Sequence, residues 1–326
     1  MELDFFLKNH IEYIRLKGIK KKTMKKAIVI FCLFILCGNG ASAKIPLFLK
    51  KILPTGTVIF TDIAYAGDTL TRHTLDLYLP PRTGNTLPLL IWIHGGGWRA
   101  GNKYNDMDYM TNTLKAILEN GYALASIEYR YRTTAIFPAQ IQDCNRAADY
   151  LYENSGKYTL DKDKMALIGF SAGGYLASLL ATSNNDTIEA FYYNKIKPRF
   201  KIRAAIDFFG PTDFIARIGS MKLDEGNQKS TSTELLGAQP VNRPDLAKVA
   251  SATTYIDQAD PPFLIFHGDK DTTVPITLSK LLDSYLQLAK VHSEFVIVNG
   301  APHGGKLFGS EVIKNKILVF LNTYLK

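Results

Sequence analysis

The sequence predicts an α/β fold in which helices cover both faces of a mostly parallel central sheet. Short apolar runs alternate along the chain with longer segments of helical periodicity, and this order favours a parallel sheet. Most of these runs are continuously apolar, which is typical of strands buried on both faces. The 326 residues, 46% of them hydrophobic, suffice for one large domain, and nothing in the length requires a second.

The first expected strand alternates apolar and polar residues as a half-buried strand does, and the later ones are buried apolar runs. They are residues 74–79, 87–93, 123–127, 165–168, 204–209, 263–266 and 295–298. The expected helices lie at residues 107–119, 141–154, 172–181, 276–289 and 311–324. In an open sheet of this kind, ligands bind beyond the carboxyl ends of the strands. Candidate site residues are therefore sought in the loops that follow strands.

Residues 1–43 are expected to be an N-terminal extension with a signal peptide, leaving residues 44–326 as the domain. Two lysines precede the apolar run 27–36, and Ala41-Ser42-Ala43 supplies the small residues of a cleavage site. Cleavage after Ala43 predicts a secreted or periplasmic protein without stable membrane insertion, because the run is shorter than the roughly 20 residues of a span. An uncleaved anchor is the alternative. Met1 and Met24 are both candidate start residues.

The charge of the remaining chain gives no reason to expect nucleic acid as a partner. Residues 44–326 carry 31 Lys and Arg against 27 Asp and Glu, a net charge of +4, without a basic stripe interleaved with aromatics. Cleavage after Ala43 also leaves Cys144 as the one cysteine, so no internal disulfide is expected.

A nucleophile elbow is the most informative pattern in the chain. Gly-Phe-Ser-Ala-Gly at residues 169–173 follows an apolar run and opens a helical segment. Glycines on both sides allow a turn tight enough to raise the hydroxyl of Ser171 above the sheet. The start of the helix leaves free N–H groups beside it.

The general base for Ser171 is expected to be His303. This histidine follows the strand expected at residues 295–298, so it lies on a loop at the carboxyl edge of the sheet. His292 precedes the same strand and falls at the opposite edge. The alternative for His303 is a solvated loop histidine.

The acid that orients His303 is expected to be Asp271, in the segment after the strand at residues 263–266. Asp269 and Asp213 are the rivals. Both are residues of the type that structures turns and helix starts, which is the alternative interpretation for them. The order Ser, Asp, His along the chain is the one expected of an α/β-hydrolase.

A glycine-rich loop, His94-Gly-Gly-Gly-Trp98, directly follows the strand at residues 87–93. Successive glycines allow the backbone to curl so that its N–H groups face a developing oxyanion, together with the N–H of Ala172. A phosphate-binding loop is disfavoured because no Gly-Lys-Ser/Thr follows. His94 is expected to fix the loop by hydrogen bonds rather than to act in chemistry.

Two further features concern the substrate. The segment 211–260 is too long for a simple crossover and is expected to form a small cap-like insertion over the site, or else a solvated excursion. Trp98, Tyr131 and Tyr175 are candidates for aromatic surface that binds substrate, with packing in the core as the alternative for each.

Together these motifs resemble the esterase and lipase branch of the α/β-hydrolase superfamily that has a His-Gly-Gly-Gly oxyanion loop, related to hormone-sensitive-lipase-like enzymes. The resemblance runs from about Leu75 to the C-terminus and also includes Tyr129-Arg130 and residues 137–140. It implies Ser171 as nucleophile, His303 as base, Asp271 as its partner, and Gly96, Gly97 and Ala172 as oxyanion donors. It implies no cofactor and no metal.

Within that branch the chain is most similar to secreted bacterial carbohydrate acetyl and feruloyl esterases. The resemblance implies hydrolysis of short acyl esters, with acetyl groups on plant polysaccharide as the expected substrate and a feruloyl or general lipolytic esterase as the alternative. A serine peptidase of the same fold is disfavoured because about 50 residues between the signal peptide and His94 are too few for a propeller domain. A binding module that has kept the fold is a third reading. Acyl length, alcohol and oligomeric state are left open.

Overall fold

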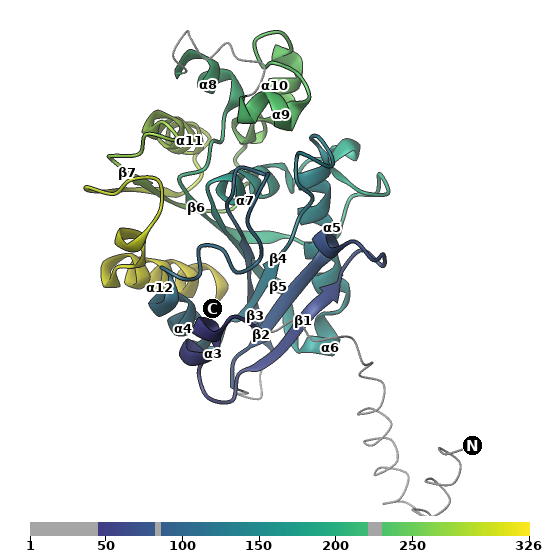
Figure 1. Cartoon of the computed structure of the whole chain (residues 1–326), viewed down its shortest axis with the longest axis vertical. Helices are drawn as coiled ribbons and strands as arrows, with labels where there is room; N and C mark the ends of the chain where they lie inside the picture. Colours follow the sequence, from purple (N-terminus) through teal and green to yellow (C-terminus); the bar gives the residue numbers. More distant parts are fainter. Residues whose placement is uncertain (1–44, 82–85, 221–229) are drawn as a thin grey trace, which may run out of the picture. The chain divides into compact units, whose positions relative to one another are not determined.

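The computed structural model describes residues 45–81, 86–220 and 230–326. The signal peptide expected in residues 1–43 and much of the polar stretch inside the expected cap lie outside these ranges. The described residues form an eight-stranded sheet (Figure 1) with the order β1-β2-β4-β3-β5-β6-β7-β8. Its strands are β1 (Val58–Ala64), β2 (Thr74–Leu79), β3 (Leu87–Ile93), β4 (Ala123–Ile127), β5 (Leu160–Phe170), β6 (Ile202–Phe208), β7 (Phe263–Gly268) and β8 (Ser293–Val298).

The sheet is mostly parallel, as predicted. Strands β3 to β8 pair in parallel, whereas β2 runs antiparallel to β4 and β1 antiparallel to β2. The edge strand β1 was not expected from the sequence, and β5 begins earlier than its apolar run.

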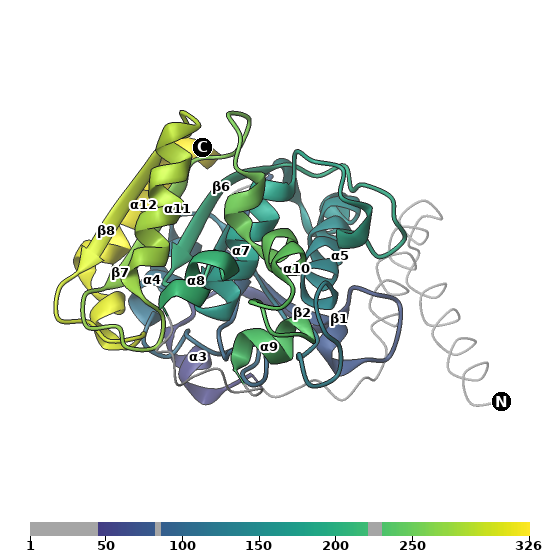
Figure 2. The ribbon, with the colours of Figure 1, turned by 90° about the horizontal axis from the view of Figure 1, so that it is seen from above.

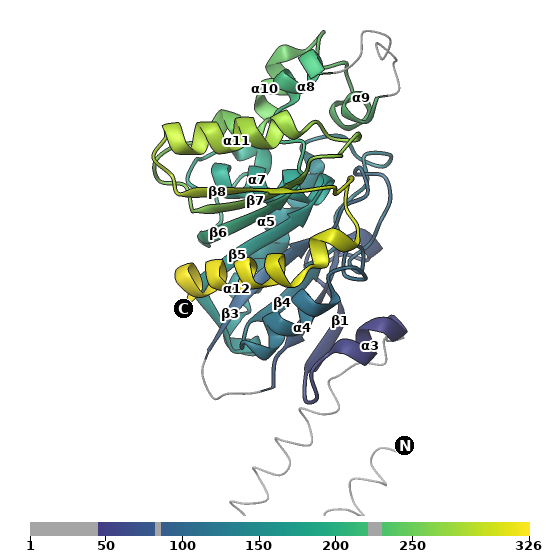
Figure 3. The same ribbon diagram turned by 90° about the vertical axis from the view of Figure 1, so that its left-hand side faces the viewer.

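Helices cover both faces of the sheet (Figure 3), which confirms the predicted layer arrangement. On one face lie α3 (Leu47–Ile52), α4 (Thr111–Glu119) and α12 (Glu311–Leu325). On the other lie α5 (Ala139–Glu153), α7 (Ala172–Ser183) and α11 (Ile276–Leu288), with the short α6 (Ser155–Tyr158) beside β5. Helix α4 begins four residues later than expected.

The core has two halves because side chains along a strand alternate between faces. In β3, Leu89 and Ile91 belong to the half under α5 and α7, whereas Leu90 and Trp92 belong to the half under α4 and α12. All four are buried. Both faces of β3 therefore contribute to the core, which explains its continuously apolar sequence.

The segment between β6 and β7 contains the helices α8 (Phe214–Ser220), α9 (Thr231–Leu236) and α10 (Pro244–Ala250). They lie over α7 in the view of Figure 2, and Figures 1 and 3 show them beyond α7, on its side away from the sheet. The side chain of Ser230 accepts a hydrogen bond from the N–H of Thr233 and so caps α9, and Gly237 ends it with φ of 71°. Ser251 ties the segment together, since its Oγ accepts the N–H of Phe214 at 2.9 Å.

Short 3₁₀ turns complete the described chain: η1 (Thr71–His73), η2 (Glu189–Phe191), η4 (Ala252–Tyr255) and η5 (Lys306–Gly309). No helix in the described ranges has the length and apolar character needed to cross a membrane. The parallel strands β3, β5, β7 and β8 end at one edge of the sheet, and the segments that follow them carry the candidate site residues.

Candidate active site

Ser171 occupies a sharp turn between β5 and α7. Its φ of 52° and ψ of −115° are strained for a residue with a side chain, and such strain is concentrated at functional sites. The N–H of Ser171 donates to the carbonyl of Phe208 at 2.8 Å, and its carbonyl accepts the N–H of Tyr175 at 2.9 Å. These bonds hold the turn, and the side chain projects from the carboxyl edge of β5.

Two glycines make this turn sterically possible. A Cβ on Gly169 would lie 2.1 Å from the carbonyl oxygen of Gly173, and one on Gly173 would lie 2.0 Å from that of Ile93. Since both obstructions are backbone atoms, a side chain at either position would force the strand and helix apart. The second contact also holds the start of α7 against the end of β3, where the glycine-rich loop begins.

The structure brings Ser171, His303 and Asp271 into one chain of hydrogen bonds. His303 Nε2 lies 2.8 Å from Ser171 Oγ, and His303 Nδ1 lies 2.6 Å from Asp271 Oδ2. An ionised carboxylate can only accept, so Nδ1 carries the hydrogen and Nε2 is the acceptor for the serine hydroxyl. This tautomer is the one a general base requires.

Asp271 is held as a carboxylate. Its side chain is fully buried, and burial opposes ionisation, but hydrogen bonds from His267 and His303 outweigh that cost and hold the pKa of this carboxyl well below its usual range. The N–H groups of Thr273 and Val274 also donate to Oδ1, at 2.8 and 2.9 Å. With Oδ1 occupied by the backbone, Oδ2 is aimed at His303.

The rival acids have structural partners instead. Asp269 Oδ1 accepts the N–H of Gly300 at 2.6 Å and so fixes a turn. Asp213 Oδ1 accepts the N–H of Ala216 at 2.7 Å at the start of α8, and its Oδ2 accepts the hydroxyl of Thr253 at 2.6 Å. Neither is hydrogen-bonded to His303, and each has the turn or helix-capping role considered from the sequence.

The glycine-rich loop lies against Ser171. A Cβ on Gly95 would be 3.6 Å from that of Ser171. Gly96 and Gly97 have φ of 115° and 57°, conformations open to glycine, and the carbonyl of Gly96 accepts the N–H groups of the two residues 99 and 100. Within the described ranges, no acceptor takes the N–H of Gly96, Gly97 or Ala172. These donors are free to bind an oxyanion.

His94 fixes this loop and is buried away from solvent. Its Nδ1 donates to the carbonyl of Gly95 at 2.6 Å, and its ring stacks on Tyr129, whose hydroxyl donates to the His94 carbonyl at 2.9 Å. The expectation that His94 supports the loop by hydrogen bonds is confirmed. Two supporting residues had no signal in the sequence: Asp106, which accepts the N–H of Gly95 at 2.9 Å, and Arg132, which contacts the carbonyl of Gly97.

The expected aromatic substrate surface requires correction at Trp98 and Tyr175, whereas Tyr131 stays a prediction. Trp98 and Tyr175 are 2% and 0% exposed and pack edge to face, with ring centroids 5.4 Å apart and Phe214 beside them. Both belong to the hydrophobic core, because the glycine-rich loop directs the indole of Trp98 inward against Tyr175 of α7. Tyr131 is half-buried, its hydroxyl donates to the carbonyl of Gly101, and the guanidinium of Arg72 lies 3.8 Å from its ring centre.

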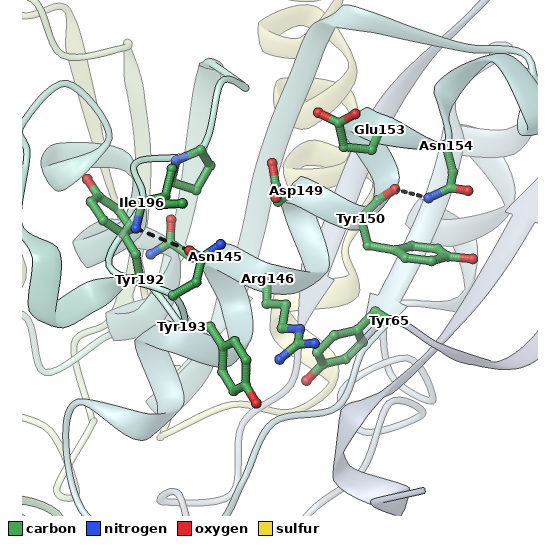
Figure 4. Close-up of a pocket in the computed structure, with 12 residues that line it drawn as sticks. Tyr65, Asn145, Arg146, Asp149, Tyr150, Glu153, Asn154, Tyr192, Tyr193 and Ile196 are labelled. Carbon is green, nitrogen blue, oxygen red and sulfur yellow. Dashed lines mark hydrogen bonds between the residues drawn. The ribbon is translucent and has the colours of Figure 1, made fainter. Parts of the chain in front are cut away.

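A separate polar cavity of about 420 Å³ lies along α5 and the segment after η2 (Figure 4). Tyr65, Arg146, Asp149 and Tyr193 are among its lining residues, and none of the candidate site residues is. It is therefore not the site described above. Across the described ranges, no group of three or more His, Cys, Asp or Glu side chains is arranged to hold a metal ion.

Comparison with known proteins identifies the family. The model of the BD-FAE family matches residues 75–286, which include the glycine-rich loop, Ser171 and Asp271. This chain belongs to the BD-FAE family. The matched region ends before His303, so the histidine is placed by the geometry alone.

Solved structures similar to this BD-FAE family member confirm the predicted α/β-hydrolase fold. A truncated form of a carbohydrate esterase from gut microbiota is 27% identical with a TM-score of 0.74, over 83% of this chain and 98% of that one. The protein titled bifunctional GH43-CE, of Bacteroides eggerthii, is 31% identical with a TM-score of 0.75, over 81% of this chain and 35% of that one.

Curated relatives of the BD-FAE chain carry esterase names. The probable carboxylic ester hydrolase LipM of Mycobacterium tuberculosis is 29% identical over 291 residues, covering 83% of this chain and 62% of the relative. Esterase LipQ of the same organism is 28% identical, covering 72% and 57%. The chain thus spans about three fifths of the length of these relatives.

Proposed function

We propose that this BD-FAE family member is a serine carboxylesterase that hydrolyses short-chain acyl esters. The observation that carries the proposal is the hydrogen-bond chain from Ser171 through His303 to Asp271, with the unpaired N–H groups of residues 96 and 97 beside it. A serine, a correctly oriented base and waiting oxyanion donors are the elements of acyl transfer. The esterase names of the relatives agree with this chemistry.

Acylation begins when Ser171 Oγ attacks the ester carbonyl carbon while His303 Nε2 takes the hydroxyl proton. The carbonyl oxygen becomes an oxyanion that accepts hydrogen bonds from the N–H groups of Gly96, Gly97 and Ala172. The tetrahedral intermediate then collapses, the alcohol leaves with the proton from His303 Nε2, and an acyl-serine remains. Asp271 stabilises the imidazolium throughout, because its lowered pKa keeps it charged.

Deacylation repeats these steps with water as the nucleophile. His303 Nε2 removes a proton from water as the water oxygen attacks the acyl carbon, and the same N–H groups bind the second oxyanion. Collapse releases the carboxylic acid and returns the proton to Ser171 Oγ. Every step uses side chains and backbone groups of this chain, so the proposal needs no cofactor.

The substrate we propose is an acetyl group on plant polysaccharide, acted on outside the cytoplasm after cleavage at Ala43. The support is the signal-peptide pattern in residues 24–43 and the likeness to the gut-microbiota carbohydrate esterase. Helices α8 to α10, between β6 and β7, form a cap-like insertion that would select the alcohol part of the ester.

Hydrolysis of p-nitrophenyl acetate, butyrate and octanoate, of methyl ferulate and of acetylated xylan tests the proposal, with Ser171→Ala as the matched variant. Ser171-dependent turnover confined to acetyl esters and xylan is the expected result. Activity on ferulate or on longer chains would replace the acetyl assignment by a feruloyl or general esterase. Absence of any Ser171-dependent hydrolysis would overturn the esterase proposal.

Export is tested separately by mass spectrometry of the protein recovered outside the cytoplasm. Cleavage after Ala43 predicts a mature chain that begins at Lys44. Recovery of a chain that retains residues before Ala41 would contradict the proposed processing.

A further inference from the structure

Arg132 contacts the glycine-rich loop and the cap-like insertion at the same time. Its guanidinium Nη1 donates to the carbonyl of Gly97, and its backbone N–H donates to the carbonyl of Trp98 at 2.7 Å. Its Nε and Nη2 each lie 2.7 Å from Glu234 Oε2, on α9. The side chain of Arg132 is only 5% exposed. One buried cation therefore joins two segments that are far apart in the sequence.

The loop needs an outside support at this point. Three successive residues have positive φ: Gly96 at 115°, Gly97 at 57° and Trp98 at 57°. For Trp98, which has a Cβ, this conformation is strained and persists only where neighbouring groups hold it. The two carbonyls that flank the strained residue are the two that Arg132 holds. Rotation about Gly97 would change the direction of its N–H, which no backbone acceptor in the described part of the chain holds.

The cap-like insertion reaches the loop at the same place. A Cβ on Gly97 would lie 3.5 Å from Arg132 Nη1 and 3.9 Å from Thr231 Cγ2, at the start of α9. Figure 3 shows α9 on the side of the sheet where the strands end. Glu234 supplies the counter-charge for a guanidinium that has little access to water. Without it, the buried cation would be uncompensated and would move toward solvent, away from Gly97.

We propose that Arg132 is a positioning residue for the oxyanion hole and that Glu234 makes this positioning depend on the seating of α9. The inference rests on the proposed function, which it deepens. The hydrogen bonds of the Arg132 side chain go to Glu234 and the Gly97 carbonyl rather than to Ser171 or His303, so it acts through the loop. It keeps the N–H groups of Gly96 and Gly97 directed at the site, so that α9 influences the rate of the chemical step as well as access to Ser171.

Steady-state kinetics with p-nitrophenyl acetate test this link in Arg132→Met, Arg132→Lys and Glu234→Gln. Full loss of one oxyanion donor costs about 10²- to 10³-fold in kcat, so misdirected donors in Arg132→Met should cost roughly 10- to 100-fold. The KM should stay within about threefold, because the interaction lost is made mainly in the transition state. Arg132→Lys should recover part of the loss, since an ammonium can still donate to the Gly97 carbonyl. Glu234→Gln should show a smaller loss.

Arg199→Met is the matched control. Arg199 lies between η2 and β6 and pairs with Glu153 of α5 at the surface, so the same change of residue type removes an ion pair that does not reach the loop. Its kcat should equal that of the parent. The pH dependence of kcat/KM should also be the same in all variants, since His303 and Asp271 keep their contacts.

Hydrogen exchange at the amides of residues 95–101 measures the positioning itself, whether or not the protein is an esterase. Faster exchange in Arg132→Met and Glu234→Gln, but not in Arg199→Met, is the expected result. If hydrolysis depends on Ser171 while Arg132→Met keeps full kcat, the inference is overturned and the proposed function stands. If the parent hydrolyses no ester, the proposed function fails. In that case, unchanged exchange in the Arg132 and Glu234 variants would also overturn the proposed positioning of the loop by Arg132. Arg132→Lys and Glu234→Gln carry the test if Arg132→Met does not fold.

Discussion

Asp271 Oδ2 lies 2.6 Å from His303 Nδ1, while Asp271 Oδ1 accepts two backbone N–H groups of the loop that carries it. Oδ1 is thus fixed by the aspartate's own loop, whereas Oδ2 faces the two histidines His303 and His267. These contacts align the Asp271 carboxylate, whereas Asp213 and Asp269 bind other groups.

The first prediction concerns the identity of the acid. Asp271→Asn should lower kcat by about 10³- to 10⁴-fold, because an amide can donate to Nδ1 and so favour the wrong imidazole tautomer. Asp213→Asn and Asp269→Asn are matched controls that should keep most of the activity. Loss of kcat in Asp213→Asn with activity retained in Asp271→Asn would reverse the assignment. Stopped assays with p-nitrophenyl acetate measure all three.

A second prediction follows from the contact between the elbow and the end of β3. In Gly173→Ala the added Cβ would lie only 2.0 Å from the carbonyl oxygen of Ile93, so the end of β3 and the start of α7 must move apart. We expect kcat to fall by about 10²-fold or more, as for a lost oxyanion donor. Gly156→Ala is the control, because a Cβ there meets no atom within 4 Å. Full activity in Gly173→Ala would show that the close approach has no role in catalysis.

The third prediction is a pH dependence of stability that arises from Asp207. Complete burial raises the pKa of this carboxyl to about 7, although the N–H of Gly210 donates to it. Because the folded state binds the proton more tightly than the unfolded chain, the free energy of unfolding should fall as pH rises from about 4 to about 7 and change little from this group above that. The amide side chain in Asp207→Asn cannot ionise, so the free energy of unfolding of this variant should not show this part of the fall with pH.

Urea denaturation of the parent and of Asp207→Asn at pH 5 and pH 8 measures this difference. The variant should gain stability relative to the parent at pH 8. Asp163→Asn, at an exposed position, should show the same difference between the two pH values as the parent. An equal decline in Asp207→Asn and parent would mean that Asp207 titrates normally.

A fourth prediction concerns the pair formed by Arg130 and Asp143. The Asp143 side chain is 2% exposed, accepts the Arg130 backbone N–H at 2.8 Å, and receives Nε and Nη2 of the guanidinium. Asp143→Ala leaves the arginine uncompensated and should lower the free energy of unfolding by about 3 kcal/mol. Asp245→Ala removes an exposed partner of Arg243 and should change it little. Comparable losses in both would show that burial does not strengthen the Arg130 pair.

Sequence patterns predicted β3, β4, β6, β7 and the second half of β5, because most residues of these segments are buried and apolar. The edge strand β1 escaped notice because none of its residues is fully buried and its register is interrupted between Phe60 and Ile63. Its sequence, Val-Ile-Phe-Thr-Asp-Ile-Ala, has apolar residues at exposed and partly buried positions alike, so it shows no alternation of apolar and polar residues to detect.

The same contrast applies to the site. Ser171, Gly169 and Gly173 form a local motif because their spacing is fixed by one turn. Arg132 and Glu234 are 102 residues apart and meet through the tertiary fold, which no local pattern records. Trp98 shows the converse limit, since an aromatic residue beside a glycine-rich loop fits a binding surface and a core equally well until its burial is known.

Ser171 has a strained backbone, with φ of 52°, so the residue that the proposed reaction requires also lowers the stability of the fold. Glycine adopts that angle without steric cost, so Ser171→Gly should abolish hydrolysis and yet raise the unfolding midpoint, which thermal denaturation measures. An unchanged or lower midpoint would mean that the hydrogen bond to His303 outweighs the strain. A protein of this fold with no reaction to perform would be more stable with glycine at this corner, so the strained serine is expected only where its hydroxyl is used.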